Sequence, residues 1–213
     1  MTVAGELDPL VVLDWRRRIA ELYREVRGTA EPQAAWEHWR ATRDELFADH
    51  PASPIPAAER PAFDGLGFFD YDPVARVEAG LRPAAGLTVE LAAADGAIYT
   101  FTRFATAGFN LAGRPFELDV HWLHGYAGGV FVSFTDRTSG ERTYGGGRYV
   151  LDTIKGADLG GSGGRLTLDF NFAYNPSCSY DPAWSCPLPS GTNRLDWPVT
   201  AGELAWAPAA GDR

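Results

Sequence analysis

The chain has 213 residues, 45% hydrophobic and 22% charged, a composition that predicts a globular fold with one sizeable core. Acidic residues outnumber basic ones by 28 to 19, and the formal charge of −9 disfavours nucleic acid as a partner, because an acidic surface is repelled by phosphates. The first residues do not resemble a secretory leader and no apolar run reaches the roughly 18 residues of a membrane span, so we expect a cytoplasmic protein with no membrane partner.

Two amphipathic helices are predicted in the first part of the chain. Asp8 and Pro9 suit the N-cap and the first position of a helix, and apolar residues then recur at spacings of three and four until Gly28. A second helix is expected to begin at Pro32. It should end near Asp49, because the four prolines of "HPASPIPAAERP" cannot continue a helix.

From about Asp64 onward the apolar residues alternate with a period of two, which indicates β-strands. Two hairpins are predicted, one turning at Asp95 and Gly96 and one whose turn contains Ser139 and Gly140. The segments "PFELDVHWL" and "RLTLDFNFAY" are expected to supply further strands. Because no helical segment interrupts these strands, they should form an antiparallel sheet.

The predicted fold class is α+β, with two N-terminal helices packed on an antiparallel β-barrel or sandwich. We assign the chain to a single domain, with a helical part in residues 1–62, the sheet in residues 63–170, and a lid loop with a final strand in residues 171–213. The last part contains "NPSCSYDPAWSCPLPSG", which is irregular but too aromatic for a disordered linker. We expect it to form an ordered lid, with both cysteines, over one end of the sheet.

Two motifs that suggest common ligands are disfavoured by their context. "TYGGGRY" has the glycines of a phosphate loop, but a phosphate loop leads into a helix, and the residues that follow here do not form one. His121 and His124 could join Cys178 and Cys186 in a zinc site, but residues three apart on a strand point to opposite faces. We therefore expect neither a metal nor a cofactor.

The two cysteines, Cys178 and Cys186, leave three alternatives open. They are buried, reduced thiols that act as small apolar residues, or they form a disulfide, or one of them is chemically active. A reducing compartment opposes the disulfide, and a nucleophilic thiolate needs a base that the sequence does not place beside it.

Two long segments of the chain resemble the signature of an uncharacterised bacterial family, the domain of unknown function family 1684. They are "FTDRTSGERTYGGGRYVLD" and "LDFNFAYNPSCSYDPAWSCPLPSGTNRLDWPVTAGE", and the resemblance extends over nearly the whole length, including "WRATRDELFADHPASPIP" and "FFDYDP". The family pattern more often has a proline where Ser177 stands and a more proline-rich run in place of "PSGT". The resemblance implies which residues match the signature, but it brings no activity with it.

The polar residues that match this signature are of the types that orient a polar ligand. Arginine forks bind carboxylates or phosphates, asparagines donate and accept, and tyrosines give flat walls with a polar tip. The candidate ligand-binding residues are Arg148, Arg194, Asn171, Asn175, Asn193, Tyr144, Tyr149 and Tyr174, and the candidate catalytic residues are Asp169, Glu203 and Cys178. The same residues would also serve as a structural hydrogen-bond network for an irregular loop.

The sequence thus favours a pocket at the barrel mouth that binds a small polar or anionic metabolite, with hydrolytic turnover as an option. The alternative is a non-catalytic protein-interaction or structural module. The sequence does not fix the oligomeric state or the ligand.

Overall fold

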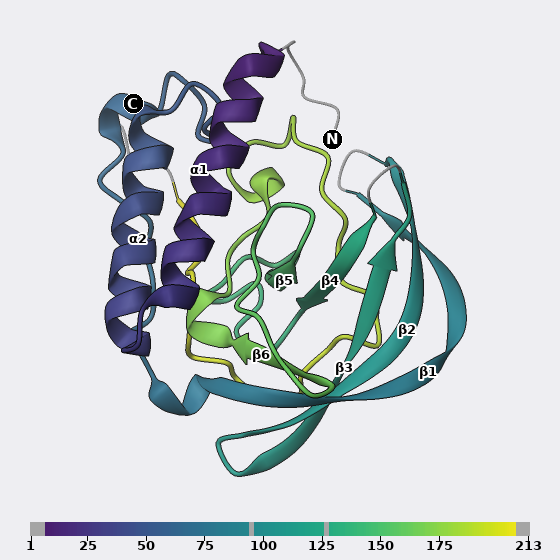
Figure 1. The fold of residues 1–213 in the computed structure, drawn as a ribbon. Coiled ribbons are helices and arrows are strands. Elements are labelled where there is room, and N and C mark those ends of the chain that lie inside the picture. The colour runs from purple at the N-terminus through teal and green to yellow at the C-terminus, as the bar shows by residue number, and fades with distance from the viewer. Residues whose placement is uncertain (1–6, 94–95, 126–127, 208–213) are drawn as a thin grey trace.

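The computed structural model describes residues 7–93, 96–125 and 128–207, and it begins with two antiparallel helices (Figure 1). These are α1 (Pro9–Gly28) and α2 (Pro32–Asp49), whose bounds agree with the sequence prediction. Asp8 caps α1 by accepting the N–H of Leu10 at 2.8 Å. Within the described residues, no helix combines the length and the apolar composition that crossing a membrane requires.

A six-stranded antiparallel sheet follows, with the strand order β5-β4-β3-β2-β1-β6. Its strands are β1 (Arg76–Ala92), β2 (Ile98–Leu111), β3 (Arg114–Leu123), β4 (Gly129–Phe134), β5 (Arg148–Asp152) and β6 (Arg165–Asp169). The sheet curls until its edge strands β5 and β6 approach each other, and the helices stand beside the open side (Figure 1). The α+β prediction is confirmed, and the sheet is a partly open barrel rather than a sandwich.

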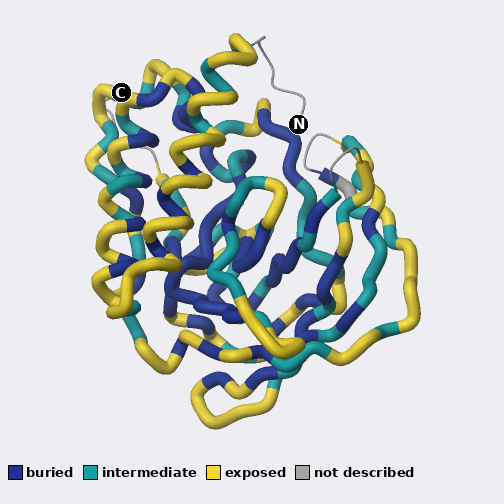
Figure 2. The backbone as a smooth tube through the Cα atoms, viewed as in Figure 1, coloured by how far each residue is buried: buried dark blue, intermediate teal, exposed yellow. Residues whose placement is uncertain are grey.

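Buried side chains form two large hydrophobic clusters. Figure 2 shows that the buried stretches of the chain lie mainly in the interior of the fold. One cluster lies among the strands and includes residues 195–201 of the C-terminal part. The other joins the inner faces of α1 and α2 to Phe101, Phe131 and Tyr149 of the sheet, with Trp39 completely buried between them. The helices therefore complete the core, because they cover an apolar side of the sheet that would otherwise face water.

Both predicted hairpins are present, with a different connection in the second. Strands β1 and β2 pair as far as Ala92 and Ile98, and Gly96 has the positive φ of +82° expected of a turn, while Asp95 lies outside the described residues. Strands β4 and β5 also pair, but residues 135–147 form a long loop between them. Ser139 and Gly140 turn the chain inside that loop.

The C-terminal segment, residues 171–207, contains isolated bridges in place of the final strand that the sequence predicts. Phe68 pairs with Glu203, and Thr135 pairs with Arg194, each through a single bridge. The prolines of this segment break any longer ladder, because proline has no N–H to donate. Scattered backbone hydrogen bonds and side-chain hydrogen bonds hold the segment instead.

The last glycine of "TYGGGRY", Gly147, lies where two backbones approach each other closely. Gly147 has a φ of +85°, and a Cβ there would lie 2.6 Å from the carbonyl oxygen of Phe134 and 2.7 Å from Cγ of Pro189. The residues that follow form strand β5 and not a helix, so the loop lacks the geometry of a phosphate loop.

Replacing Gly147 by alanine is therefore expected to lower the free energy of unfolding by about 1–3 kcal/mol, through backbone strain and the steric clash. Urea denaturation would measure the change. Gly145→Ala is the matched control, because its Cβ would lie 3.6 Å from Cα of Gly140, an ordinary contact, and we expect it to be nearly neutral. Equal losses in the two variants would contradict this explanation.

Candidate ligand-binding site

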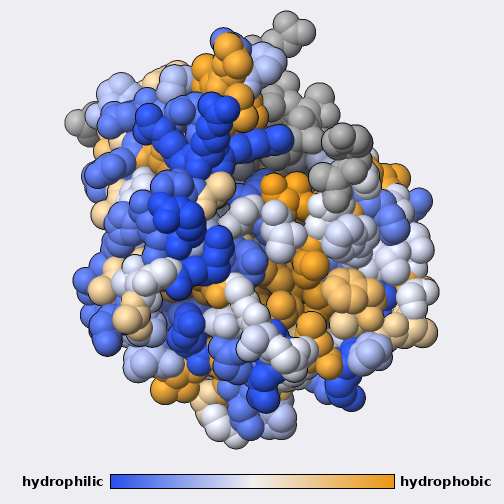
Figure 3. All heavy atoms as spheres, viewed as in Figure 1, coloured by the Kyte–Doolittle hydropathy of each residue, from blue (hydrophilic) through white to orange (hydrophobic). Residues whose placement is uncertain are grey.

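A cavity of about 300 Å³ lies between α1, α2, the sheet and the C-terminal segment. Figure 3 shows apolar side chains in the hollow between α1 and the sheet, whereas the outer faces of both helices are mostly hydrophilic. The aromatic residues that line the cavity are Trp15, Tyr23, Phe47, Tyr99, Phe101, Phe131, Tyr149, Tyr174, Tyr180 and Trp184. Its walls therefore suit a ligand with an apolar body.

Two polar atoms of the cavity wall have no hydrogen-bond partner among the described residues. They are Nε of Arg43 and Oδ1 of Asn175, and their residues are only 6% and 2% exposed. Both side chains bind the carboxylate of Glu203, Arg43 through Nη2 at 2.9 Å and Asn175 through Nδ2 at 3.2 Å. Both residues line the cavity and bind the same carboxylate, so the unpartnered donor and the unpartnered acceptor belong to neighbouring side chains of its wall.

A carboxylate and a lysine mark another part of the wall. Oδ1 of Asp152 accepts the N–H groups of Ile154 at 3.1 Å and Lys155 at 3.2 Å, and its Oδ2 lies 3.5 Å from the hydroxyl of Tyr174. Burial raises the pKa of Asp152, and the neighbouring charge of Lys155 opposes this shift. Nζ of Lys155 lies 5.8 Å from the ring centre of Tyr149.

Glu203, a candidate proton-transfer group, is the centre of a buried network. Besides Arg43 and the Asn175 side chain, its carboxylate accepts the Asn175 N–H at 3.1 Å and the hydroxyl of Tyr180. Burial raises the pKa of Glu203, while Arg43 and Tyr180 favour its charged form. Glu203 is not among the residues that line the cavity, whereas its partners Arg43, Asn175 and Tyr180 are, so it supports the cavity wall from behind.

Arg148 also belongs to a structural network and not to the cavity. The side chain is fully buried, and its Nη2 donates to Asp136 at 2.7 Å and to the carbonyl of Val199 at 3.1 Å. Its Nη1 donates to the carbonyl of Ala201. Arg194 forms a bridge with Thr135, next to Phe134 that pairs with Arg148, but Arg194 is exposed whereas Arg148 is fully buried, so the two side chains do not face one common site.

Asn171 and Asp169 form a turn outside the cavity. The Nδ2 of Asn171 donates to Asp169 at 2.8 Å and to the carbonyl of Asp72 at 2.8 Å. Burial raises the pKa of Asp169, and hydrogen bonds from Asn171 oppose the shift. For these residues and for Arg148, the geometry supports the structural alternative.

Asn193 ties the C-terminal segment to the sheet. Its Oδ1 accepts the N–H of Asp119 at 2.7 Å, and its Nδ2 donates to the carbonyls of Asp119 at 3.0 Å and Ser133 at 2.8 Å. This amide therefore replaces part of a missing strand pairing between the segment and strands β3 and β4.

Two of the three predicted tyrosines line the cavity. Tyr149 and Tyr174 pair through their backbones, and the hydroxyl of Tyr149 donates to the carbonyl of Pro187 at 2.6 Å. Tyr144 lies elsewhere, with its hydroxyl 3.8 Å from Sγ of Cys178. Burial raises the pKa of Tyr144 to about 12.

Cys178 and Cys186 are both buried and free, so the disulfide alternative is not realised in this structure. They pack in one cluster with Trp184, with Leu7 and Tyr144 at its edge. Their neighbours in the chain, Ser177, Ser185 and Pro187, line the cavity.

The histidines considered for zinc have other contacts. His121 is buried edge-on against the ring of Phe101, with ring centres 6.0 Å apart, and Nε2 of His124 lies 2.7 Å from the hydroxyl of Thr102. In residues 7–93, 96–125 and 128–207, no group of three or more His, Cys, Asp or Glu side chains could hold a metal ion.

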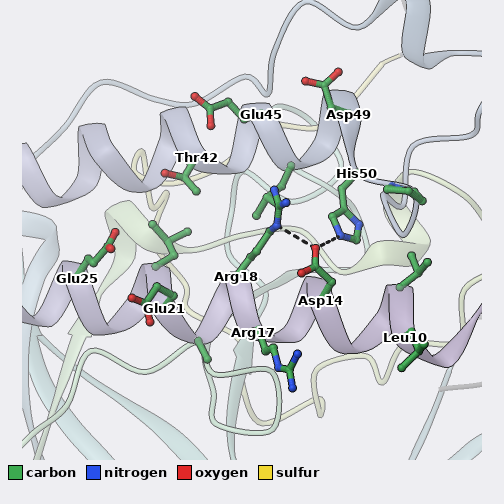
Figure 4. Close-up of a pocket in the computed structure, with 15 residues that line it drawn as sticks. Leu10, Asp14, Arg17, Arg18, Glu21, Glu25, Thr42, Glu45, Asp49 and His50 are labelled. Carbon is green, nitrogen blue, oxygen red and sulfur yellow. Dashed lines mark hydrogen bonds and ion pairs between the residues drawn. The ribbon is translucent and has the colours of Figure 1, made fainter.

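A second, open groove runs along the outer side of α1 and α2 (Figure 4). Oδ2 of Asp14 lies 3.1 Å from Nε2 of His50 and 3.0 Å from Nε of Arg18. The Nδ1 of His50 accepts the N–H of Ala52 at 3.0 Å, so both ring nitrogens are occupied. This dyad holds the end of α2 to α1, and neither ring nitrogen of His50 is free to act as a base.

The sequence alone did not identify Arg43, Asp152 and Lys155 as site residues. Arg43 had a recognisable signal, since it falls on the buried side of a helix whose other residues there are apolar. For Asp152 and Lys155, which follow the end of a buried strand, the sequence gave no comparable pattern.

Comparisons with known proteins identify relatives without assigning an activity. A family model described as "Protein of unknown function (DUF1684)" matches residues 61–204. A solution NMR structure of an uncharacterised protein from Haloarcula marismortui is 40% identical, with 78% of this chain and 89% of that chain covered and a TM-score of 0.57. No curated protein matches.

Proposed function

We propose that this chain, which belongs to the DUF1684 family, binds a small molecule in the aromatic cavity beside α1. The observation that carries the proposal is the pair of unpartnered polar atoms in the cavity wall, Nε of Arg43 and Oδ1 of Asn175. A buried polar atom without a partner costs about 1–3 kcal/mol. Both atoms are inaccessible in this structure but belong to side chains that line the cavity, so a ligand that turns them towards itself recovers part of this energy.

The ligand class follows from the shape and polarity of the wall. A volume of about 300 Å³ equals roughly ten water molecules, so the ligand is compact. The aromatic residues favour an apolar body, and the two polar atoms favour a head group that both accepts and donates, such as an amide or a hydroxyl. Because Arg43 is already paired with Glu203, a neutral head is preferred over an anionic one.

The proposal is for binding and not for turnover. Asp169 and Glu203 are held by protein contacts outside the cavity lining, and Asp152 is the carboxylate that lies in it. Hydrolysis and a cytoplasmic location stay predictions from the sequence.

A series of small aromatic probes that share a benzene ring but carry different substituents tests this proposal. Toluene, benzyl alcohol, benzamide and benzoate would be titrated into the protein while the indole N–H resonances of Trp15 and Trp184 are followed by NMR. We expect both indoles to shift, because both line the cavity. At about 1 kcal/mol per added hydrogen bond, benzamide should bind at least about fivefold more tightly than toluene, and benzoate more weakly than benzamide.

Two variants in which leucine replaces alanine test whether the probes bind in the cavity or at another surface. Ala157 is buried in the cavity wall, so Ala157→Leu should reduce the affinity for benzamide by filling the space. Ala20 is exposed on α1, and Ala20→Leu should bind like the wild type. If neither indole responds to any probe, or if the two variants bind equally well, the proposal is wrong.

A further inference from the structure

Asp152 brings a buried carboxylate to the cavity wall, in addition to the polar atoms of Arg43 and Asn175. It is the last residue of strand β5, it lines the cavity, and it is 3% exposed. Its backbone exchanges two hydrogen bonds with Ala157, at 2.8 and 2.9 Å, which close the turn between the two residues. The carboxylate is therefore held in place by the fold before any ligand binds.

The two oxygens of this carboxylate differ in the donors that they have. Oδ1 accepts the backbone N–H groups of Ile154 at 3.1 Å and Lys155 at 3.2 Å. Within the described residues, Oδ2 has one hydrogen bond, with the hydroxyl of Tyr174 at 3.5 Å. A strong bond between a hydroxyl and a carboxylate is much shorter, about 2.5–2.7 Å. Oδ2 is thus an acceptor without a strong donor.

No protein cation compensates for this weak contact. In the part of the chain that the structure describes, no lysine, arginine or histidine forms an ion pair with Asp152. Nζ of Lys155 instead lies 5.8 Å from the ring centre of Tyr149. Buried carboxylates are normally paired with a cation or well supplied with hydrogen bonds, so a donor from a ligand would stabilise Asp152.

Tyr174 connects Asp152 with the polar pair at the other part of the wall. Its hydroxyl contacts Oδ2 of Asp152, and the guanidinium carbon of Arg43 lies 5.3 Å from its ring centre. Since all three residues line the cavity, one small molecule that lies along Tyr174 can contact both polar groups. Lys155 lines the same cavity and already brings a positive charge to it, so a neutral donor suits Oδ2 better than a second cation.

We propose that the ligand of this cavity is a compact ring compound with two polar groups, an amide or hydroxyl head bound by Arg43 and Asn175 and a neutral hydroxyl that donates to Oδ2 of Asp152. This inference rests on the proposed function and adds the second polar group to it. Asp152 then selects for a hydroxyl over an ether or an alkyl group of the same size, because only the hydroxyl donates. A site built to bind a hydroxyl discriminates strongly against an analogue without one.

Three substituted benzamides of nearly equal size test for the second group. They carry an ethyl, a methoxy or a hydroxymethyl substituent, each in the para and in the meta position. Each would be titrated into the full-length protein while the indole N–H resonance of Trp184, which lines the cavity, is followed by NMR. The better hydroxymethyl isomer should bind at least about tenfold more tightly than its ethyl and methoxy analogues, because hydrogen bonds to charged groups are the stronger ones.

Asp152→Asn tests whether this carboxylate is the acceptor. The amide oxygen can still accept the backbone N–H groups of Ile154 and Lys155, but an amide nitrogen, which only donates, replaces the second oxygen. The advantage of hydroxymethyl over ethyl should fall below about threefold in this variant, since the charged acceptor is gone. Asp196→Asn is the matched control and should keep the full advantage, because Asp196 is 82% exposed and does not line the cavity.

The outcomes separate this inference from the proposed function. If benzamide binds but neither hydroxymethyl isomer gains over its ethyl analogue, the second polar group is wrong and the binding proposal stands. An advantage that survives in Asp152→Asn would assign the acceptor to another residue and also overturn the inference. If no benzamide shifts the Trp184 resonance, both proposals are wrong. The comparison of the probes on the wild type does not depend on any variant folding.

Discussion

Replacing Arg148 by methionine is expected to lower the free energy of unfolding by about 3–5 kcal/mol, the usual loss when one partner of a buried ion pair is removed. The carboxylate of Asp136 would stay buried without its cation, since both side chains of the pair are completely inaccessible. The carbonyls of Val199 and Ala201 would lose their donor as well. Denaturation with urea, followed by tryptophan fluorescence, would measure the loss.

The matched control for Arg148 is an exposed pair of the same kind. Nε of Arg137 lies 2.8 Å from Asp196, with the two side chains 60% and 82% exposed, so water replaces the lost partner. We expect Arg137→Met to leave the urea midpoint of unfolding unchanged. If Arg148→Met were as stable as this control, the guanidinium would not be what holds residues 199–203, and the ligand-binding role predicted from the sequence would regain support.

Replacing Glu203 by glutamine is expected to lower the free energy of unfolding by a similar amount, about 3–5 kcal/mol. The reason is that the Arg43 guanidinium would be left buried without a charged partner. The amide also cannot accept all of the hydrogen bonds that now come from Arg43, Asn175 and Tyr180. Thermal and urea denaturation would measure the effect. Since Arg43 lies on α2, the helices should loosen from the sheet in this variant.

A double-mutant cycle isolates the pair from other effects of the substitution. Arg43→Met keeps a long apolar side chain between Trp39 and Phe47 but removes the charge. The double variant should be more stable than the sum of the single losses predicts, because neither charge is then left alone. Glu21→Gln, in an exposed pair with Arg24 on α1, is the control and should not change stability. Strict additivity would show that the pair contributes through packing alone.

The fold was largely predictable because its signals are local. The caps at Asp8 and Pro9, the proline run after Asp49 and the alternation of the strands each depend on residues close together in sequence. The long loop between β4 and β5 and the missing final strand were not predictable in this way. They depend on contacts between distant segments, such as Arg148 with residues 199–201.

The candidate site was only partly predictable for the same reason. The sequence shows that a residue is polar, but not whether its partners are already in the protein. Asn171 and Asn193 are fully used inside the fold and Arg148 is held by Asp136 and two carbonyls, whereas Oδ1 of Asn175 has no partner among the described residues. Distinguishing the two cases needs the positions of Asp136, Asp72, Asp119 and Glu203, which are distant in sequence.

The edges of the curved sheet bear on self-association. An exposed edge strand is a template on which another chain can add a strand and begin to aggregate. Here β5 is entirely buried, and its outer side exchanges backbone hydrogen bonds with Tyr174, at 2.9 and 3.0 Å. On the opposite edge, Thr167 of β6 donates its N–H to the carbonyl of Gly160. Irregular segments of the same chain thus occupy edge positions at both ends of the sheet, and they protect an extended β-fold from growing into a fibre.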